Sequence, residues 1–321
     1  MNTINVILSI LVSLALTVLI MPFYIKALKQ HHINQSVSEY ALDAYKQKEK
    51  TPIMGGLIFV IVPIVVFFIL NYATINKTTI MVIISFIMFA SVGFWDDILI
   101  ILRNNNEGLS PKFKLVLELV ITVFIFFLYK NDISCSIELP FLNGGVILPW
   151  YIFLPFMVLL YSAEANAVNF TDGMDGLCAG VSLIGLIAFS IIAFKENRMD
   201  LFILILCVCG GLIGYLFFNF HPAKIFMGDS GSLALGALFA SIGIVLDKEI
   251  ALFIIGGVFV IEMFCVCLQL LFVKLFHKRV FSYTPIHYAF VLKGHKEVNI
   301  VIGFYIVEIC LALIGLFVGL H

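Results

Sequence analysis

The chain has few charged residues: they make up 12% of its 321 positions, and the net charge is −1. Soluble domains carry about a quarter charged residues, so a soluble fold of this composition could not cover its surface. A net charge near zero also provides no strong basic field, and we expect no nucleic-acid partner. The hydrophobic fraction of 62% and the mean hydropathy of +1.12 indicate a polytopic membrane protein.

The chain also lacks the cysteine pattern of a disulfide framework or a zinc site. Five of the seven cysteines lie inside apolar runs, where cysteine usually acts as a small buried hydrophobe: Cys207, Cys209, Cys265, Cys267 and Cys310. The first apolar segment, residues 4–28, has no small-residue cleavage site and is too long for a signal peptide. We therefore interpret it as a retained membrane span.

Ten continuous apolar stretches, separated by polar loops, are each long enough to be a membrane helix. They cover residues 4–28, 52–72, 78–101, 113–129, 146–165, 177–194, 199–218, 231–246, 250–276 and 299–320. They predict an all-α, polytopic integral membrane protein with about ten transmembrane helices, in which residues 1–321 form a single domain. The loops after odd-numbered spans hold 14 of the 19 Lys and Arg residues. The positive-inside rule then makes these loops cytoplasmic and both termini external.

Polar residues that could carry chemistry gather in four clusters, each at the end of a predicted span. The clusters are Asp96-Asp97, residues 166–175, residues 226–232 and residues 285–295. Carboxylates so close to hydrocarbon are costly and are best explained by function. All four clusters fall on the predicted cytoplasmic side, although they were not used to assign it. This agreement predicts one composite active site at the cytoplasmic surface of the membrane.

The cluster at residues 166–175 combines amide and carboxylate side chains at helical spacing. Asn166 and Asn169 are three residues apart and share a helix face, and Asp172 and Asp175 repeat that spacing. Such a run offers oxygen atoms to a cation, a sugar or a nucleobase. A helix cap followed by a turn is the structural alternative, but a cap needs one Asp.

The other clusters have the residue types that phosphate chemistry uses. The glycines of residues 226–232 precede a predicted helix, whose free N–H groups suit phosphate, and a divalent cation would reconcile Asp229 with that anion. In Asp96-Asp97, mutual repulsion favours a base or a cation site. Lys114 could bind phosphate. Each of these residues also has a structural alternative: a helix cap for Asp229, an anchoring charge pair for the two aspartates, and a snorkelling side chain for Lys114.

Six stretches together match a known family in order and spacing. They are Thr51-Pro-Ile-Met-Gly-Gly, Gly93-Phe-Trp-Asp-Asp, Gly108-Leu-Ser-Pro-Lys-Phe-Lys, Asn166-Ala-Val-Asn-Phe-Thr-Asp-Gly-Met-Asp-Gly-Leu, Phe226-Met-Gly-Asp-Ser-Gly-Ser and Pro285-Ile-His. Along essentially its whole length, the chain resembles the polyprenyl-phosphate N-acetylhexosamine-1-phosphate transferases. The first and last stretches, with Leu292-Lys-Gly, favour the branch that uses UDP-N-acetylmuramoyl-pentapeptide.

The resemblance implies a reaction and its partners. A polyprenyl phosphate, here undecaprenyl phosphate, attacks the β-phosphate of the UDP-sugar, so that UMP leaves and the lipid-linked product, lipid I, forms for peptidoglycan synthesis. It further implies an Mg²⁺ cofactor, a multi-pass location in the bacterial cytoplasmic membrane among its lipids, and a homodimer. Phosphoryl transfer needs positioning and charge neutralisation more than covalent chemistry, and the acidic and lysine residues suit that need.

The resemblance also assigns roles to residues. The expected catalytic residues are Asp96, Asp97, Lys114, Asp229 and His287, of which Asp229 is the expected Mg²⁺ ligand. The expected substrate-binding residues are Lys48, Asn166, Asn169, Asp172, Gly173, Met174, Asp175, Asn219, Phe226 and Gln269. Within these sets, Asp96 would deprotonate or orient the lipid phosphate, and Phe226 would stack on uracil.

The last motif departs from the family pattern. The family usually has three consecutive histidines followed by Phe-Glu, whereas this chain reads His287-Tyr288-Ala289-Phe290-Val291. Ala289 cannot form a hydrogen bond through its side chain, so a role of that histidine is lost or moved. This departure leaves open the same chemistry with UDP-N-acetylglucosamine for another surface polymer. The intramembrane polar residues leave open a different class, a non-catalytic membrane paralogue that transports or binds lipid.

Overall fold

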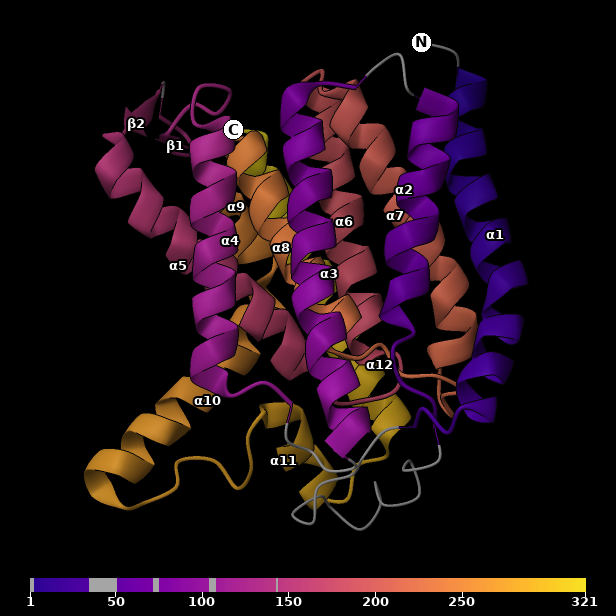
Figure 1. Cartoon of the computed structure of the whole chain (residues 1–321). Coiled ribbons are helices and arrows are strands. Elements are labelled where there is room, and N and C mark those ends of the chain that lie inside the picture. The colour runs from indigo at the N-terminus through magenta and orange to yellow at the C-terminus, as the bar shows by residue number, and fades with distance from the viewer. Residues whose placement is uncertain (1–2, 35–50, 72–74, 104–107, 143) are drawn as a thin grey trace.

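The computed structural model describes residues 3–34, 51–71, 75–103, 108–142 and 144–321. Over these residues the chain folds into a bundle of helices with one small β-hairpin (Figure 1). The helices are α1 (Thr3–Gln30), α2 (Gly56–Asn71), α3 (Lys77–Arg103), α4 (Pro111–Tyr129), α5 (Trp150–Thr171), α6 (Leu177–Lys195), α7 (Met199–Asn219), α8 (Asp229–Val245), α9 (Glu249–Ile255), α10 (Gly257–Phe276), α11 (Ile286–Leu292) and α12 (Glu297–Gly319).

The all-α, polytopic membrane fold predicted from the sequence is confirmed. Each of the ten predicted spans overlaps with helical structure, and seven described helices are long and apolar enough to cross a bilayer. Two further apolar helices, α2 and α8, are shorter. The predicted spans are helical because hydrocarbon offers backbone groups no hydrogen-bond partners, so a continuous apolar run must satisfy them within its own helix.

Three features were not predicted. Strands β1 (Ser136–Glu138) and β2 (Gly145–Ile147) form an antiparallel hairpin in which Ile137 pairs with Val146. The short helix α11 lies in the last predicted cytoplasmic loop. The predicted span 250–276 is two helices, α9 and α10, which meet at Gly256.

A buried carboxylate lies at the break between α9 and α10. The backbone N–H of Val258 donates to Glu308 of α12, with 3.4 Å between nitrogen and oxygen. A helix that begins inside an apolar bundle leaves N–H groups without helical partners, and Glu308 accepts from one of them. A Cβ at Gly257 would approach the side chain of Leu311 to 2.7 Å, so a glycine there lets the start of α10 lie close to α12.

Helix α8 lies buried between other helices of the bundle. Every residue of α8 from Ser230 to Ile244 is buried, and α8 packs most extensively against α3 and α5. Its small residues allow this close approach, as at Gly236, which lies against the backbone of Glu164 and Ala165. The packing brings the first residue of α8 next to α3 and α5.

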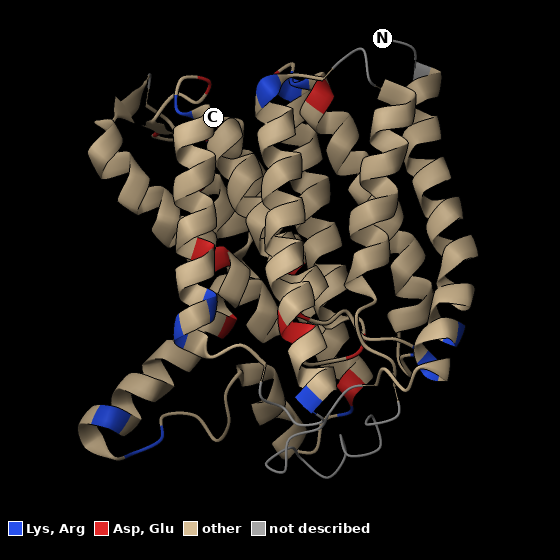
Figure 2. Cartoon of the chain, in the orientation of Figure 1, with Lys and Arg blue, Asp and Glu red and all other residues tan. Residues whose placement is uncertain are grey.

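Charged residues are concentrated toward the two ends of the bundle (Figure 2). α1 begins and α12 ends at the same end, where Arg198 pairs with Asp200 and Lys248 pairs with Glu138 (Figure 1). The acidic and amide motifs predicted as the active site lie in the half of the bundle nearest the α10–α11 loop. The side of the membrane that each end faces remains a prediction.

Candidate active site

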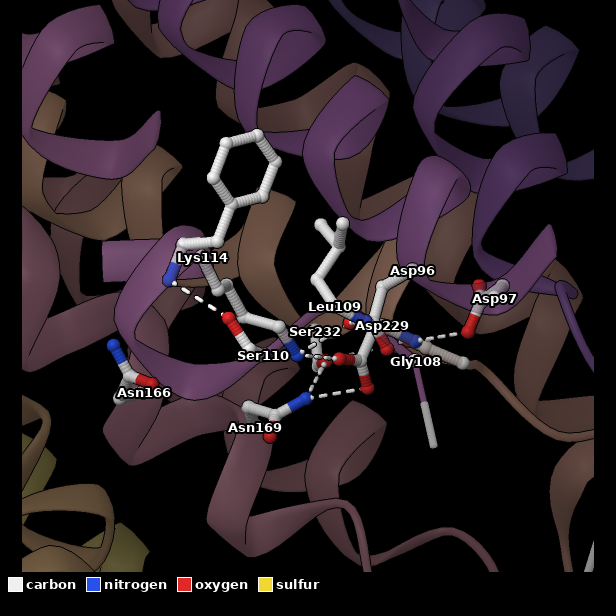
Figure 3. A network of polar contacts seen from close by, with 12 residues as sticks. Asp96, Asp97, Gly108, Leu109, Ser110, Lys114, Asn166, Asn169, Asp229 and Ser232 are labelled. Carbon is white, nitrogen blue, oxygen red and sulfur yellow. Dashed lines mark hydrogen bonds and ion pairs between the residues drawn. The ribbon is translucent and has the colours of Figure 1, made fainter. Parts of the chain in front are cut away.

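Three helices contribute the charged centre of the site. Asp96 and Asp97 lie near the end of α3, Lys114 lies in the first turn of α4, and Asp229 is the first residue of α8. The Lys114 ammonium is 2.6 Å from Asp229 Oδ2 and 3.1 Å from Asp96 Oδ1. We call these four residues the acid–lysine cluster (Figure 3). Residues from three separate sequence motifs are thus brought together, as the sequence predicted.

Within the acid–lysine cluster, Asp97 is committed to the backbone of α8. Its carboxylate accepts hydrogen bonds from the backbone N–H groups of Asp229 and Ser230, at 3.0 and 3.1 Å. Gly228, just before α8, has φ +76°, and a Cβ there would approach the Asp97 carboxylate to 2.6 Å. The residue is therefore glycine for both backbone and steric reasons. A carboxylate at a helix N-terminus is favourable, so Asp97 fixes the position of Asp229.

Asp96 has a different set of partners. Its Oδ1 accepts from the backbone N–H of Leu109 at 2.8 Å and also faces Lys114. The Asp96 and Asp97 side chains are nearly fully buried, whereas the Asp229 side chain is 23% exposed. Among these three carboxylates, Asp229 is therefore the one that an ion or substrate can reach most readily.

The two asparagines predicted to share a helix face do so on α5 but contact different groups. The Asn169 amide donates to Asp229 Oδ1 at 2.7 Å and to Ser232 Oγ at 2.9 Å (Figure 3). The Asn166 amide donates to the Glu118 carboxylate at 3.1 Å. Sequence reasoning missed Glu118, although a carboxylate one turn after Lys114 in an apolar run was a usable signal. Glu118 is completely buried on α4.

The next predicted segment, from Asp172 to Asp175, connects α5 to α6. Asp172 caps the C-terminus of α5, directly after its last residue, Thr171, and Met174 is buried. Asp175 Oδ2 lies 2.8 Å from His221 Nδ1, and the backbone N–H of Asp175 donates to Glu297 Oε1 at 2.8 Å. His221, which no sequence pattern singled out, therefore pairs with Asp175 of the segment that follows α5.

Two further predicted substrate-binding residues, Asn219 and Phe226, lie at the end of α7 and in the loop before α8. Asn219, at the end of α7, donates to the carbonyl of Ile225 at 2.9 Å and accepts from Gly176 N–H at 3.0 Å. It therefore ties the start of α6 to the loop before α8. Phe226 is half-buried, and its backbone N–H donates to the carbonyl of Pro52. Its predicted stacking on uracil remains a prediction.

Gln269 and Lys48 complete the predicted substrate-binding set. The Gln269 carbonyl accepts from the backbone N–H groups of Val280 and Phe281, and its amide donates to the carbonyl of Phe281. Gln269 therefore shapes the loop between α10 and α11. Lys48 lies outside the described residues.

His287 is completely buried at the start of α11. Its Nδ1 lies 3.1 Å from Glu262 Oε1 of α10, and its ring contacts that of Tyr288 at 4.2 Å between centroids. The Tyr288 hydroxyl donates to the carbonyl of Gly173 at 3.1 Å. The last motif thus reaches the α5–α6 segment as predicted. Sequence reasoning missed Glu262.

The donor atoms of the acid–lysine cluster fit a hard divalent cation. Carboxylate oxygens of Asp229 and Asp96 lie close to the same point, and the ammonium group of Lys114 offsets their negative charge there. Mg²⁺ prefers oxygen ligands of this kind. Another group of metal-ligand type in the described chain is Asp175, His221 and Glu297, whose ligand atoms lie within 4.8 Å of one another. A ring nitrogen suits transition metals better than Mg²⁺, and hydrogen bonds already account for that cluster.

The chain matches the model of glycosyl transferase family 4 over residues 79–247, which include nearly all of α3, the whole of α4 to α8 and all four residues of the acid–lysine cluster. It is 37% identical over 315 residues to a phospho-N-acetylmuramoyl-pentapeptide-transferase of Staphylococcus saprophyticus subsp. saprophyticus, covering 96% of this chain and 98% of the relative. It is 38% identical over 318 residues to a protein of the same name from Staphylococcus aureus strain bovine RF122, covering 97% and 98%.

The fold and the site define a multi-pass membrane protein with an acidic and lysine centre at one end of its bundle. The chain belongs to glycosyl transferase family 4 and, within it, to the phospho-N-acetylmuramoyl-pentapeptide-transferases. Seven span-length helices and these bacterial relatives make it a multi-pass protein of a bacterial membrane.

Proposed function

We propose that this protein transfers phospho-N-acetylmuramoyl-pentapeptide from its UDP-activated form to undecaprenyl phosphate, giving lipid I and UMP. The observation that carries the proposal is the acid–lysine cluster, in which Lys114 lies between Asp229 and Asp96. Two anionic reactants can be brought together only where cationic groups offset their charge. A lysine with two carboxylates available to a divalent cation supplies that arrangement.

The residues of the site divide the work of this reaction. Asp229 would hold Mg²⁺, with Asp96 beside it, and the bound ion would neutralise charge developing on the diphosphate. Lys114 would bind a phosphate oxygen once the cation engages Asp229. Asp96 would orient the lipid phosphate or take its proton. Asn169 holds the Asp229 carboxylate in place through its 2.7 Å hydrogen bond.

The position of the site matches the two reactants. Undecaprenyl phosphate keeps its tail in hydrocarbon and its phosphate at the headgroup level, and the UDP-sugar arrives from water. The acid–lysine cluster lies near the ends of α3, α4 and α8, at one end of the bundle. The segment from Asp172 to Asp175, with Asn219 and Phe226, would bind the nucleoside and diphosphate. By family resemblance we expect a homodimer, which the mass of the purified protein in detergent would test.

The altered histidine motif bears on the choice of donor sugar. Tyr288 and Ala289 stand where the family usually has histidines, so neither offers an imidazole to the UDP-sugar. The Tyr288 hydroxyl donates instead to the carbonyl of Gly173, and Ala289 is buried. This observation favours one second candidate, the same reaction with UDP-N-acetylglucosamine.

The deciding experiment is UMP release by purified protein with undecaprenyl phosphate and Mg²⁺, with each UDP-sugar offered separately. Release from UDP-N-acetylmuramoyl-pentapeptide alone supports the proposed reaction. Release from UDP-N-acetylglucosamine alone replaces it with the second candidate. Silence with both donors contradicts both, and the Asp229→Ala variant is the blank for contaminating activity.

A further inference from the structure

Glu262 is a buried carboxylate of α10 whose hydrogen bonds, among the described residues, reach the start of α11. Its Oε2 accepts from the backbone N–H of Ile286 at 2.7 Å. Its Oε1 accepts from the backbone N–H of His287 at 3.3 Å and lies 3.1 Å from His287 Nδ1. Neither the Glu262 side chain nor the His287 side chain is exposed to solvent. A carboxylate inside an apolar helix is costly unless it is fully hydrogen-bonded, so these contacts account for its presence there.

The partnership determines which nitrogen of His287 is available. A carboxylate that accepts from two backbone N–H groups has no hydrogen to give, so Nδ1 carries the hydrogen and donates it to Glu262. His287 Nε2 is then the nitrogen left for other chemistry. This atom is buried and has no hydrogen-bond partner among the described residues.

The free nitrogen is aimed at the α5–α6 segment. A Cβ built on Gly173 would collide with His287 Nε2, which shows that this atom lies directly against the Gly173 backbone. Gly173 follows Asn169 by four residues, and Asn169 binds Asp229 of the acid–lysine cluster. His287 Nε2 therefore faces the segment to which the family resemblance assigns the nucleoside and diphosphate.

Tyr288 secures the other side of the His287 ring. Its ring packs on His287, and its hydroxyl donates to the carbonyl of Gly173 at 3.1 Å. Burial, reinforced by the charge of Asp172, raises the pKa of Tyr288, so the hydroxyl keeps its hydrogen and remains a donor. The imidazole is thus held at Nδ1 by Glu262 and is contacted by the tilted ring of Tyr288.

We propose that Glu262 is a positioning residue, which holds His287 so that Nε2 is presented to the UDP-sugar at Gly173. This role rests on the proposed function. Glu262 does not touch the substrate; it acts through the tautomer and orientation of His287. An orienting carboxylate behind a functional histidine is a recurring arrangement in enzymes.

A double-mutant cycle tests this role through UMP release. The Glu262→Gln variant keeps the size of the side chain but replaces one carboxylate oxygen by an amide N–H₂ group. That group cannot accept from the backbone N–H of Ile286, the backbone N–H of His287 or His287 Nδ1. The His287→Asn variant retains a donor near the position of Nδ1 and removes Nε2. The matched control is Glu308→Gln, because Glu308 is equally buried and accepts from the same helix α10.

We expect Glu262→Gln to lower kcat about 10- to 100-fold, with the KM for the UDP-sugar changed no more than about threefold. Adding Glu262→Gln to His287→Asn should change kcat by less than about threefold, because a residue that acts through His287 has nothing left to position. Glu308→Gln should keep the wild-type kcat.

Additive losses in the double variant would overturn the proposal and make Glu262 a structural residue. An equal loss of kcat in Glu308→Gln would also overturn it, because the loss would then follow from replacing any buried glutamate near α10 and not from the contact with His287. A wild-type protein that releases no UMP overturns the proposed function, and the role of Glu262 falls with it.

Discussion

Asp97 and Asp229 are 132 residues apart in the chain, and the carboxylate of Asp97 accepts a hydrogen bond from the backbone N–H of Asp229 at 3.0 Å. It also accepts from Ser230, so one side chain of α3 determines where α8 begins. The Asp229 carboxylate is thereby free to face Lys114 and Asn169. The adjacent aspartates of α3 thus have separate tasks: Asp97 holds the backbone of α8, and Asp96 faces the lysine.

The first prediction concerns Asp97→Asn. An amide offers one acceptor oxygen and a donor group, and the donor would face a backbone N–H at the start of α8. We expect a loss of about 1–3 kcal/mol in the free energy of unfolding, together with a fall in activity of at least about tenfold. Thermal unfolding in detergent and UMP release measure the two effects. Asp132→Asn is the control, because Asp132 pairs with an exposed lysine; equal effects in both variants would contradict the role of Asp97.

The second prediction concerns Asp229→Ala. Removing the most accessible carboxylate of the acid–lysine cluster should abolish Mg²⁺-dependent turnover, by about a thousandfold or more. The unfolding temperature should stay near that of the wild type, because the carboxylate is partly exposed and its backbone still reaches Asp97. UMP release across an Mg²⁺ titration is the measurement. Wild-type turnover in this variant would refute the assignment of Asp229 as the metal ligand.

The third prediction compares two lysines on the first turn of α4. Lys114 lies between Asp96 and Asp229, whereas Lys112 is exposed. Lys114→Met should lower kcat about 100- to 1,000-fold, because a charge that offsets the phosphates is lost in a partly buried site. Lys112→Met should leave kcat within about twofold of wild type, as is usual for an exposed charge. Comparable losses in the two variants would mean that Lys114 contributes only general positive charge.

The fourth prediction concerns two glycines. A Cβ at Gly173 would meet His287 Nε2 and the Tyr288 hydroxyl, whereas a Cβ at Gly303 would meet nothing within 4 Å. Both contacts at Gly173 are with side chains that are held in place, so Gly173→Ala should lower activity at least about tenfold and lower the unfolding temperature. Gly303→Ala, in the middle of α12, should stabilise the helix by up to about 1 kcal/mol. Full activity in Gly173→Ala would show that α11 moves away from this segment during turnover.

Much of the fold and part of the site could be predicted from the sequence. Continuous apolar runs leave a backbone in hydrocarbon no choice but to form helices, and this rule is local. It located helical structure in each of the ten predicted spans, but it missed α11 and the break at Gly256, where Glu308, far along the chain, supplies the acceptor that a helix start needs. The family resemblance likewise assigned Asp96, Lys114 and Asp229 to one site, and the structure brings them together.

What only the tertiary structure decided is how those residues divide their contacts. Asp96 and Asp97 are adjacent and chemically identical, yet one faces Lys114 and the other the start of α8, because they project in different directions from the same helix. Glu262 is an isolated carboxylate in an apolar run, and its meaning depends on the fold of a loop that brings His287 to it. By itself the sequence determined which residue types are present and which segments are apolar enough to form membrane helices. Pairings across more than a hundred residues depend on helix packing, which no local pattern encodes.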